Sequence, residues 1–273
     1  MPREGTGPDF IEALARGLEV IAAFQPRQPV MSLAEVANAT GLARPTVRRI
    51  LLTLAELGYV RQHAGGFALT PRILDLGVAY IQSMGLWDVA RPHLERLVER
   101  TEQSCSIAQL DGSDVVYVAR VAVPKIVTLA VQIGTRFPAL PTSLGKVLLA
   151  ALQPDDVARV LAEPSRSGLV PVWQPDREEW EAELREVRAR GWAMTDEQLA
   201  KGIRSVAAPL RDGSGRVIAS VNVNAHAAET PVEVLLDEYL PLLLQTAGEI
   251  SVDFARLESA PHVQRPLAPT GSG

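Results

Sequence analysis

Apolar residues recur at helical spacing in the N-terminal part of the chain, and the intervals between them carry signals that end helices. The spacing predicts one helix over Phe10–Phe24 and another over Pro45–Leu57, each with a single apolar face. Between them, Ser32 and Glu35 have the spacing of a capping box, which predicts a short helix that ends at about Gly41. The chain therefore begins with three predicted helices, and a glycine turn separates the second from the third.

A predicted β-hairpin follows the third helix. Gly58 ends that helix, and Tyr59–His63 and Phe67–Thr70 have the composition of two short strands. The segment Ala64–Gly66 between them predicts a tight turn. The order helix, helix, turn, helix and hairpin is that of a winged helix-turn-helix, so we expect a DNA-binding domain over residues 1–70.

The remainder of the chain predicts a second domain of mixed helices and strands. Residues 71–85 have an amphipathic pattern, which predicts a linker helix whose apolar side needs a partner. In residues 86–258 the predicted strands lie before and after a helical middle, which indicates an α+β domain with an antiparallel sheet. Residues 259–273 lack periodic apolar positions, so we expect a disordered tail there. The expected strands are Cys105–Leu110, Val115–Val121, Ile126–Gln132, Trp192–Thr195, Ser205–Arg211 and Arg216–Asn224, and the expected helices are Leu86–Thr101, Ser143–Leu152, Asp155–Glu163, Arg177–Arg190 and Val232–Glu258.

Composition excludes several classes of protein. The 47% hydrophobic and 22% charged residues are those of an ordinary globular chain. The sequence has no run of about 18 apolar residues and no basic start followed by an apolar stretch, so we expect a cytoplasmic protein without a membrane span or a signal peptide. Cys105 is the single cysteine and the four histidines lack ligand spacing, so we expect no disulfide, no metal site and no cofactor.

Charge is divided unevenly along the chain. The net charge is −5, but residues 1–85 hold eight arginines against seven acids, which leaves −6 for residues 86–273. The segment from 44 to 61, which includes the third predicted helix, holds four arginines and one acid. This is a small basic footprint rather than a basic protein, as expected for a protein that binds DNA through one element.

The third predicted helix is the candidate for reading DNA. A helix that enters the major groove needs long hydrogen-bond donors on its outer face, and Arg48 and Arg49 lie on the face that the apolar stripe leaves free. The alternative is a solvated helix face, which is the more common case for an isolated amphipathic helix. The surrounding capped helix, glycine turn and hairpin favour DNA binding. The expected DNA-binding residues are Arg44, Pro45, Thr46, Arg48, Arg49, Thr53 and Arg61.

The last predicted strand of the second domain carries polar residues on one face. In Ser220-Val221-Asn222-Val223-Asn224 the alternation places the serine and both asparagines on one side and the valines on the other. Two neighbouring amides are costly to bury unless something binds them, so this face is a candidate site for a polar ligand. The alternative is a sheet face that is open to solvent.

Two further features favour an anion as that ligand. Ser143 stands at the start of a predicted helix, where free backbone amides and the helix dipole attract negative charge. Ordinary N-capping by Thr142 or Ser143 is the alternative, and both can hold. Arg120, in a predicted strand, can bind a carboxylate ligand, or it can pair instead with Asp114 or Glu102.

Several motifs resemble the IclR family of bacterial transcriptional regulators. In the first domain they are Ser-Leu-Ala-Glu-Val-Ala from Ser32, Gly-Leu-Ala-Arg-Pro-Thr-Val-Arg-Arg-Ile-Leu from Gly41 and Leu-Gly-Tyr-Val from Leu57. In the second they are Leu-Pro-Thr-Ser-Leu-Gly-Lys-Val-Leu-Leu-Ala from Leu140, Gly-Trp-Ala-Met-Thr-Asp-Glu-Gln from Gly191, Gly-Ile-Arg-Ser-Val-Ala-Ala-Pro from Gly202 and Ala-Ser-Val-Asn-Val from Ala219. The first and third predicted helices resemble the branch that controls protocatechuate and β-ketoadipate catabolism.

This resemblance implies a GAF-like effector domain, with the ligand between the sheet and the middle helices. Ser205 stands where many relatives have cysteine, and Arg204 is expected to be structural. Ala43 stands where relatives often have serine or threonine, so the bond that caps the third helix is expected to be missing. The positions that the resemblance assigns to the effector are Thr142, Ser143, Gly145, Asp196, Ile203, Ser205, Asn222 and Asn224.

The sequence therefore predicts a DNA-binding transcriptional regulator that a small carboxylate controls. The resemblance suggests protocatechuate, 4-hydroxybenzoate or β-ketoadipate as the effector, operator DNA as the partner, and a homodimer or tetramer as the assembly. The alternative is a DNA-binding protein whose second domain serves only oligomerisation. We do not expect an enzyme, because Ser143 lacks a Gly-x-Ser-x-Gly context, Lys146 lacks a phosphate-binding glycine loop, and no histidine lies near Ser143 or Cys105.

Overall fold

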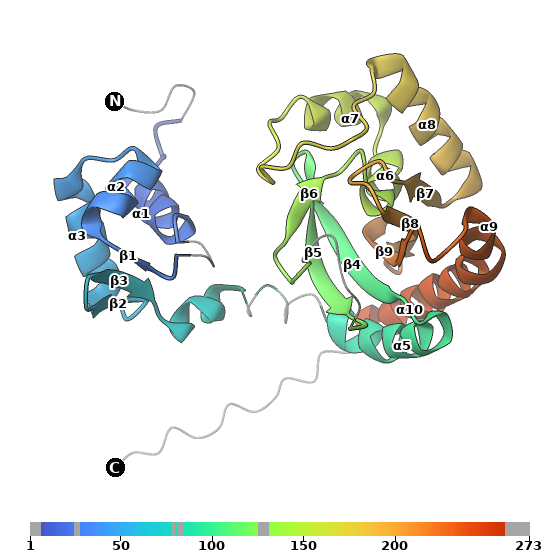
Figure 1. The fold of residues 1–273 in the computed structure, drawn as a ribbon, viewed down its shortest axis with the longest axis horizontal. Coiled ribbons are helices and arrows are strands. Elements are labelled where there is room, and N and C mark those ends of the chain that lie inside the picture. Colours follow the sequence, from blue (N-terminus) through green and yellow to red (C-terminus); the bar gives the residue numbers. More distant parts are fainter. Residues whose placement is uncertain (1–6, 25–27, 78–79, 81–84, 125–130, 260–273) are drawn as a thin grey trace, which may run out of the picture. The chain divides into compact units, whose positions relative to one another are not determined.

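The chain divides by its internal contacts into two compact units, Met1–Ser83 and Met84–Gly273 (Figure 1). The division falls inside residues 71–85, where a linker is expected. Within the part of the chain that the structure describes, no helix is long and apolar enough to cross a membrane. The structure is a computed structural model that describes residues 7–24, 28–77, 80, 85–124 and 131–259.

The first unit begins with helices α1 (Glu12–Ala22), α2 (Leu33–Thr40) and α3 (Arg44–Glu56). The predicted capping box of α2 is confirmed, because the Glu35 amide donates to Ser32 Oγ at 3.3 Å and the Ser32 amide donates to Glu35 Oε2 at 2.7 Å. The glycine that follows α2 has a φ of 67°, the left-handed conformation that ends a helix. The helix-turn-helix that the sequence predicts is therefore present.

The first unit also contains a three-stranded sheet. Its strands are β1 (Val30–Met31), β2 (Val60–His63) and β3 (Gly66–Leu69), in the order β1-β3-β2. The hairpin of β2 and β3 confirms the prediction, whereas β1 was not expected, because two residues are too few to show the alternation of a strand. Gly66 allows β1 to approach, since a Cβ there would lie 2.3 Å from the carbonyl oxygen of Met31.

The end of α3 differs from the prediction. Val47, Leu51 and Leu54 are buried as expected, but Leu57 is 52% exposed and does not belong to the apolar face. The helix ends at Glu56, and Gly58 with a φ of 82° turns the chain away from it. The side chain of Leu57 therefore leaves the stripe that its sequence spacing assigns to it.

Several expectations fall partly on residues that the structure does not describe. The linker segment starts with the 3-10 turn η1 (Pro71–Ile73) and continues as α-helix over residues 74–77, but residues 78–79 and 81–84 lie outside the described part. The predicted strand over Ile126–Gln132 lies outside it as far as residue 130, and its last two residues are not strand. The predicted tail lies outside it from residue 260 onward.

The second unit is built on an antiparallel sheet, as predicted. Its strands are β4 (Ser104–Asp111), β5 (Asp114–Val121), β6 (Arg136–Pro138), β7 (Ala193–Asp196), β8 (Ile203–Arg211) and β9 (Val217–His226). They lie in the order β6-β5-β4-β9-β8-β7, so the two strand groups of the sequence meet where β4 pairs with β9. The short edge strand β6 was not expected. The α+β class is confirmed.

Helices cover both faces of this sheet (Figure 1). They are α5 (Leu86–Thr101), α6 (Ser143–Ala150), α7 (Pro154–Leu161), α8 (Arg177–Arg190), α9 (Val232–Val234), the π-helical turn η2 (Leu235–Tyr239) and α10 (Leu240–Ser259). On one face, α5 and α10 bury Val206, Val221 and Val223. On the other face, α6 packs over Ala108 and Ala207, and α8 packs against α6.

The C-terminal helix predicted over Val232–Glu258, with a kink at Pro241, is divided by the π turn η2. Pro241 has no N–H to donate to the carbonyl of Asp237, and its ring crowds that carbonyl. The wider turn of η2 lies directly before α10 and lets the chain continue as a helix beyond the proline. Leu235 of η2 and Leu243 of α10 remain fully buried on either side of Pro241.

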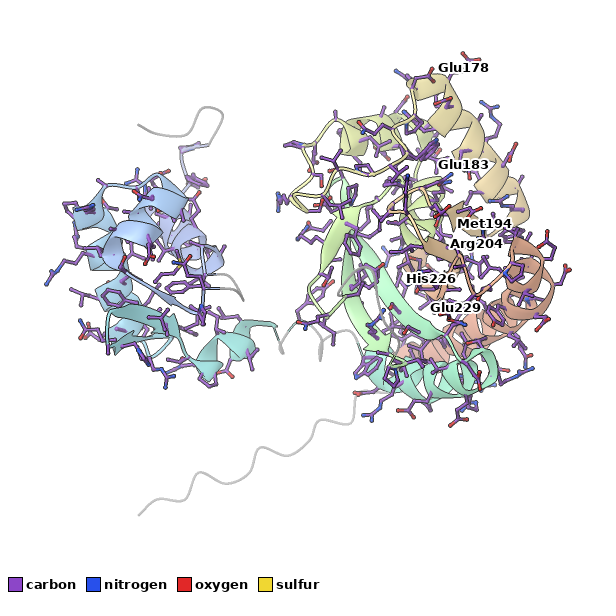
Figure 2. All side chains as sticks on the ribbon, in the orientation of Figure 1. Glu178, Glu183, Met194, Arg204, His226 and Glu229 are labelled. Carbon is purple, nitrogen blue, oxygen red and sulfur yellow. The ribbon has the colours of Figure 1, made fainter. Side chains whose placement is uncertain are left out.

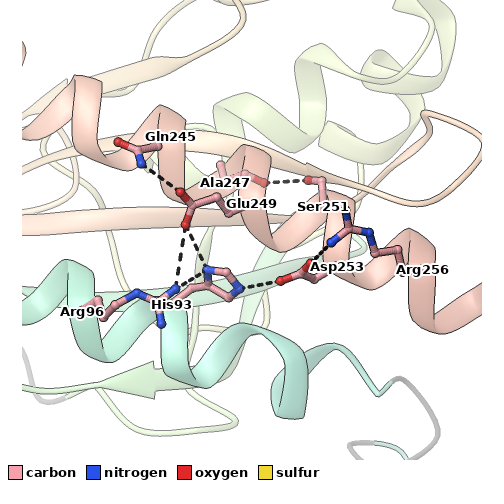
Figure 3. A network of polar contacts seen from close by, with 8 residues as sticks. All are labelled: His93, Arg96, Gln245, Ala247, Glu249, Ser251, Asp253 and Arg256. Carbon is pink, nitrogen blue, oxygen red and sulfur yellow. Dashed lines mark hydrogen bonds and ion pairs between the residues drawn. The ribbon is translucent and has the colours of Figure 1, made fainter.

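A cluster of charged side chains joins α5 to α10 (Figure 3). His93 of α5 has Nδ1 3.2 Å from Glu249 and Nε2 3.0 Å from Asp253, both on α10. Arg96 Nη2 lies 2.8 Å from His93 Nδ1 and 3.8 Å from the Glu249 carboxylate. A hydrogen bond from Gln245, and then one from His93, lower the pKa of Glu249. Because His93 contacts both carboxylates, it ties α5 to α10 on the side of the sheet away from α6.

Candidate functional site

The outer face of α3 presents arginines to solvent. Arg44, Arg48 and Arg49 are exposed, and no carboxylate among the described residues lies within ion-pair distance of them. Pro45 lies in the first turn, and Ala43 makes no side-chain bond to cap the helix, as expected. Guanidinium groups that no protein group occupies can donate to guanine or to phosphate oxygens.

The other residues predicted to bind DNA are placed less uniformly. Thr46 is partly buried, and the exposed Thr53 donates from Oγ1 to the Arg49 carbonyl oxygen at 2.9 Å. The Thr53 hydroxyl therefore offers lone pairs to DNA rather than a hydrogen. Arg61 is exposed on β2 opposite Ala68, where it lines a hollow of about 510 Å³ on the three-stranded sheet.

In the second unit, the sheet face under α6 gathers polar side chains, and we call it the polar face. The strand register places Ser106 between Arg120 on β5 and Asn222 on β9, in one row across the sheet. Ser220 Oγ donates to the carbonyl oxygen of Leu144 in α6 at 3.0 Å, which places this row on the α6 side. The residues of the polar face are Ser106, Arg120, Thr195, Ser205, Ser220 and Asn222.

The start of α6 contacts the polar face through hydroxyl groups. Thr142 caps the helix by accepting from the Gly145 amide at 3.0 Å, so the ordinary capping bond is present. Ser143 is buried, and its Oγ lies 2.7 Å from Ser205 Oγ, which lies 3.0 Å from Thr195 Oγ1. Gly145 allows the close approach, since a Cβ there would lie 2.0 Å from the carbonyl oxygen of Ala139.

Arg120 and Asn222 meet at Ser106. Arg120 Nη1 donates to Ser106 Oγ at 3.0 Å, and the Ser106 amide donates to Asn222 Oδ1 at 3.1 Å. Ser106 and Asn222 are buried, and Arg120 is half-buried, so desolvation lowers its pKa. Asp114, one of the acids considered as a partner for Arg120, accepts instead from Ser165 Oγ and from the Arg166 amide.

The remaining residues assigned to the effector are not all brought to the polar face. Asp196 pairs in register with Arg204, and its carboxylate lies 2.7 Å from Arg204 Nε (Arg204 is labelled in Figure 2). Because Thr195 faces α6, the next residue, Asp196, faces the opposite side. Arg204 also donates to the Thr230 carbonyl oxygen at 2.7 Å, which agrees with the structural role expected for it. Ile203 and Asn224 flank Ser205 on the α6 side and are partly buried.

Two residues of the polar face were missed in the sequence. Ser106 and Thr195 lie in predicted strands, but the sequence does not show which residues of the neighbouring strands they lie beside. The strand register places Ser106 beside Arg120 and Thr195 beside Ser205. The signal that could have found Ser106 is the run of small residues at Ser104, Ser106 and Ala108, which alternate with larger ones in β4. Small side chains on one face leave room for a ligand.

A buried lysine holds α6 in place. The side chain of Lys146 is fully buried, with Nζ 2.8 Å from Glu183 Oε1 of α8 and 4.7 Å from the centre of the Trp173 ring (Glu183 is labelled in Figure 2). Burial lowers the pKa of Lys146, and the Glu183 carboxylate opposes that shift. This ion pair fixes the turn of α6 that follows Ser143. No group of histidine, cysteine or acidic side chains in the described ranges could hold a metal ion.

Known proteins are similar to this chain over most of its length. Residues 13–64 match the IclR helix-turn-helix domain, and residues 78–252 match the C-terminal domain of bacterial IclR transcriptional regulators. The chain is 36% identical over 244 residues to the Pca regulon regulatory protein of Pseudomonas putida, which covers 89% of this chain and 84% of that protein.

A second relative and a solved structure extend the comparison. The p-hydroxybenzoate hydroxylase transcriptional activator of Acinetobacter baylyi is 33% identical over 247 residues, which covers 89% of this chain and 91% of that protein. An IclR homolog from Microbacterium hydrocarbonoxydans, crystallised with 4-hydroxybenzoate, has a TM-score of 0.77 at 22% identity and covers 90% of this chain and 99% of that one. The chain therefore belongs to the IclR family of bacterial transcriptional regulators.

Proposed function

We propose that this regulator binds operator DNA through α3 and that a small aromatic carboxylate, bound on the polar face, controls its activity. The observation that carries the proposal is the row of Arg120, Ser106 and Asn222 under α6. A half-buried guanidinium with a neutral hydroxyl as its hydrogen-bond partner is a favourable place for an anion. The effector residues expected from the sequence that lie on or beside this face are Thr142, Ser143, Gly145, Ile203, Ser205, Asn222 and Asn224.

The relatives support aromatic catabolism as the process. The names of the two relatives refer to the Pca regulon and to p-hydroxybenzoate hydroxylase, and the similar structure from Microbacterium hydrocarbonoxydans was crystallised with 4-hydroxybenzoate. Protocatechuate, 4-hydroxybenzoate and β-ketoadipate are the compounds that we propose to test first. A regulator of this kind acts where its operator is, in the bacterial cytoplasm.

We also propose that the protein works as a homodimer or tetramer. A single recognition helix reads too little DNA for high specificity, whereas a dimer reads two half-sites. Leu14 and Leu18 on α1 are 61% and 54% exposed, and Leu74 and Leu76 of the linker segment are 63% and 53% exposed. Apolar side chains at this exposure favour contact with a second copy.

Thermal unfolding with a panel of small acids tests the effector proposal. A ligand at 100 times its dissociation constant stabilises the folded state by roughly 2.7 kcal/mol, which raises the midpoint by several degrees in a domain of this size. We expect aromatic carboxylates to do this for the wild type and not for Asn222→Leu. If no acid shifts the wild-type midpoint, the second unit serves assembly rather than sensing.

A further inference from the structure

We infer that Arg72 and Tyr59 are positioning residues for DNA reading, because together they fix the start of the linker segment to the end of α3. This inference rests on the proposed function, in which α3 reads operator DNA and the protein works as a dimer or tetramer. It adds a determinant of specificity that acts without contacting a base: the separation and relative direction of two recognition helices.

Tyr59 is tied to the last turn of α3 through its backbone. Its amide donates to the carbonyl oxygen of Leu54 at 2.9 Å, and Gly58, which precedes it, has a φ of 82°. This bond together with a left-handed glycine is a Schellman motif, which ends a helix and fixes the residue that follows the glycine. Tyr59 also packs against the apolar core of the first unit, which includes the buried Leu54. The position of the Tyr59 ring therefore follows the position of α3.

The start of the linker segment is bonded to the same two residues. The Thr70 amide donates to the Tyr59 carbonyl oxygen at 2.9 Å, and Thr70 Oγ1 donates to the Gly58 carbonyl oxygen at 2.5 Å. Thr70 directly precedes the 3-10 turn η1, and its carbonyl oxygen accepts from the Ile73 amide at 3.1 Å. The first turn of the linker segment is therefore joined directly to the end of α3.

The side chain of Arg72 completes this junction by covering the Tyr59 ring. The guanidinium carbon lies 5.4 Å from the centre of the ring, the geometry of a cation–π contact. Gly58 leaves room for the guanidinium, since a Cβ there would lie 3.2 Å from Arg72 Nη1. Among the residues that the structure describes, no carboxylate lies within ion-pair distance of Arg72. The Tyr59 ring is therefore the partner that orients this guanidinium.

The alternative role of Arg72 is a direct contact with DNA. Arg72 is exposed, and an exposed arginine can bind a phosphate oxygen. A phosphate contact depends on the charge of Arg72 alone, whereas positioning depends equally on the ring of Tyr59. The two roles therefore predict different results for a substitution of Tyr59.

The junction matters because a dimer must place two copies of α3 over two half-sites. Half-sites lie about one helical turn apart or a multiple of it, so one added base pair displaces a half-site by about 3.4 Å and rotates it by roughly 35°. To follow the half-site, α3 must turn relative to the linker segment that connects it to the rest of the chain. In the wild type this turn breaks the contact of Arg72 with Tyr59, which costs about two- to fivefold in affinity.

Fluorescence anisotropy of the full chain with two duplexes tests the inference. One duplex is selected by the wild type from a random pool, and the other has one base pair inserted between its half-sites. The ratio of the two dissociation constants is the insertion penalty. Tyr59→Leu and Arg72→Gln should each lower this penalty by about two- to fivefold, because neither variant has the contact to break. Arg72→Lys keeps a cation over the ring and should retain most of the penalty.

A matched control and a second variant keep the test independent of charge and of folding. Arg159→Gln removes the same charge from an exposed site on α7 and should show the wild-type penalty. Thr70→Val removes the hydroxyl that donates to Gly58 but changes neither the charge nor the ring. It should therefore lower the insertion penalty even where Tyr59→Leu does not fold.

The outcomes separate this inference from the proposed function. A phosphate contact predicts that Arg72→Gln reduces the salt dependence of affinity by a slope of about one and that Tyr59→Leu keeps the wild-type penalty; these two results together overturn the inference. An equal penalty in the wild type and all variants, or a selected duplex with a single half-site, also overturns it, while DNA reading by α3 stands. If the wild type selects no duplex, the proposed function and this inference both fail.

Discussion

Ser143 Oγ and Ser205 Oγ lie 2.7 Å apart, although 62 positions separate the two residues in the sequence. The contact joins the first residue of α6 to β8 near the start of that strand, and Ser205 extends it to Thr195 on β7. A ligand that competes for either serine therefore also acts on the packing of α6 against the sheet. This gives a physical route from ligand binding to a change in the second unit.

Replacing Arg48 and Arg49 together with alanine should weaken DNA binding by several kcal/mol, at about 1–3 kcal/mol for each lost base contact. The reason is that both side chains are exposed on α3 and have no hydrogen-bond or ion-pair partner among the residues that the structure describes. Gel-shift titration at fixed salt, with duplexes that the wild type has selected from a random pool, measures this.

The control for that pair is Arg159→Ala with Arg177→Ala, which removes two exposed positive charges from the second unit. This control should bind the selected duplexes like the wild type. Equal loss of affinity in both double variants would show that net charge matters and α3 does not read DNA.

Gly145→Ala should destabilise the second unit, because the steric cost of the added Cβ exceeds the gain from the higher helix propensity of alanine. The added Cβ would lie 2.0 Å from the carbonyl oxygen of Ala139, so α6 must move away from the segment before it. We expect the free energy of unfolding to fall by roughly 1–3 kcal/mol, the usual cost of overpacking. Gly248→Ala is the control, because a Cβ there meets no atom within 4 Å. An unchanged stability in Gly145→Ala contradicts the close approach.

Glu183→Gln should lower the free energy of unfolding by roughly 3 kcal/mol at neutral pH, because it leaves a buried ammonium without its partner. Burial lowers the pKa of Lys146 in the folded state, so between that pKa and 10.5 the unfolded state binds more protons. Stability therefore rises with pH in this window. Without Glu183 the pKa of Lys146 falls further, and the rise should begin at a lower pH. Urea unfolding across the alkaline range measures it.

Lys146→Met in the Glu183→Gln background is the matched control for that pH series. It removes the titrating group while it keeps a long apolar side chain in the same space. The additional rise of stability with pH should then disappear. A pH profile of Glu183→Gln that coincides with that of the wild type argues that Lys146 is not held by this ion pair.

The protein should scatter light as a dimer or tetramer at micromolar concentration. Leu14 and Leu18 are exposed on α1, so Leu14→Glu with Leu18→Glu should shift the population toward the monomer. The exposed apolar pair Val170 and Val172 of the second unit serves as a control for the effect of added charge. A wild-type monomer under these conditions excludes the assembly.

The helices of this protein were predictable because their ends are coded locally. The capping box at Ser32, the glycine turns after α2 and α8, and the boundaries of α8 required no knowledge of distant residues. The strands β1 and β6 were not predictable in the same way. Each has two or three residues and owes its conformation to a partner strand elsewhere in the chain. Such a strand is too short to show an alternation of apolar and polar residues in the sequence.

The polar face was predictable only in part. The alternation along β9 correctly predicted that Asn222 lies on the opposite face of the sheet from Val221 and Val223. This prediction needs only the strand itself, because successive side chains of a strand point to opposite faces. The family resemblance assigned Asp196 to the effector pocket, whereas the strand register places Asp196 on the opposite face with Arg204. That Ser106 lies beside Asn222 follows only from the pairing of β4 with β9.

The central claim is that DNA reading by α3 is coupled to a carboxylate on the polar face. The measurement that tests it most directly is the dissociation constant for a selected duplex, by fluorescence anisotropy at fixed salt, with and without a saturating aromatic acid. We predict a change of about 5- to 150-fold in the wild type, the range of ordinary allosteric coupling, and none in Asn222→Leu. A wild-type dissociation constant that is the same with and without an acid shown to bind contradicts the account.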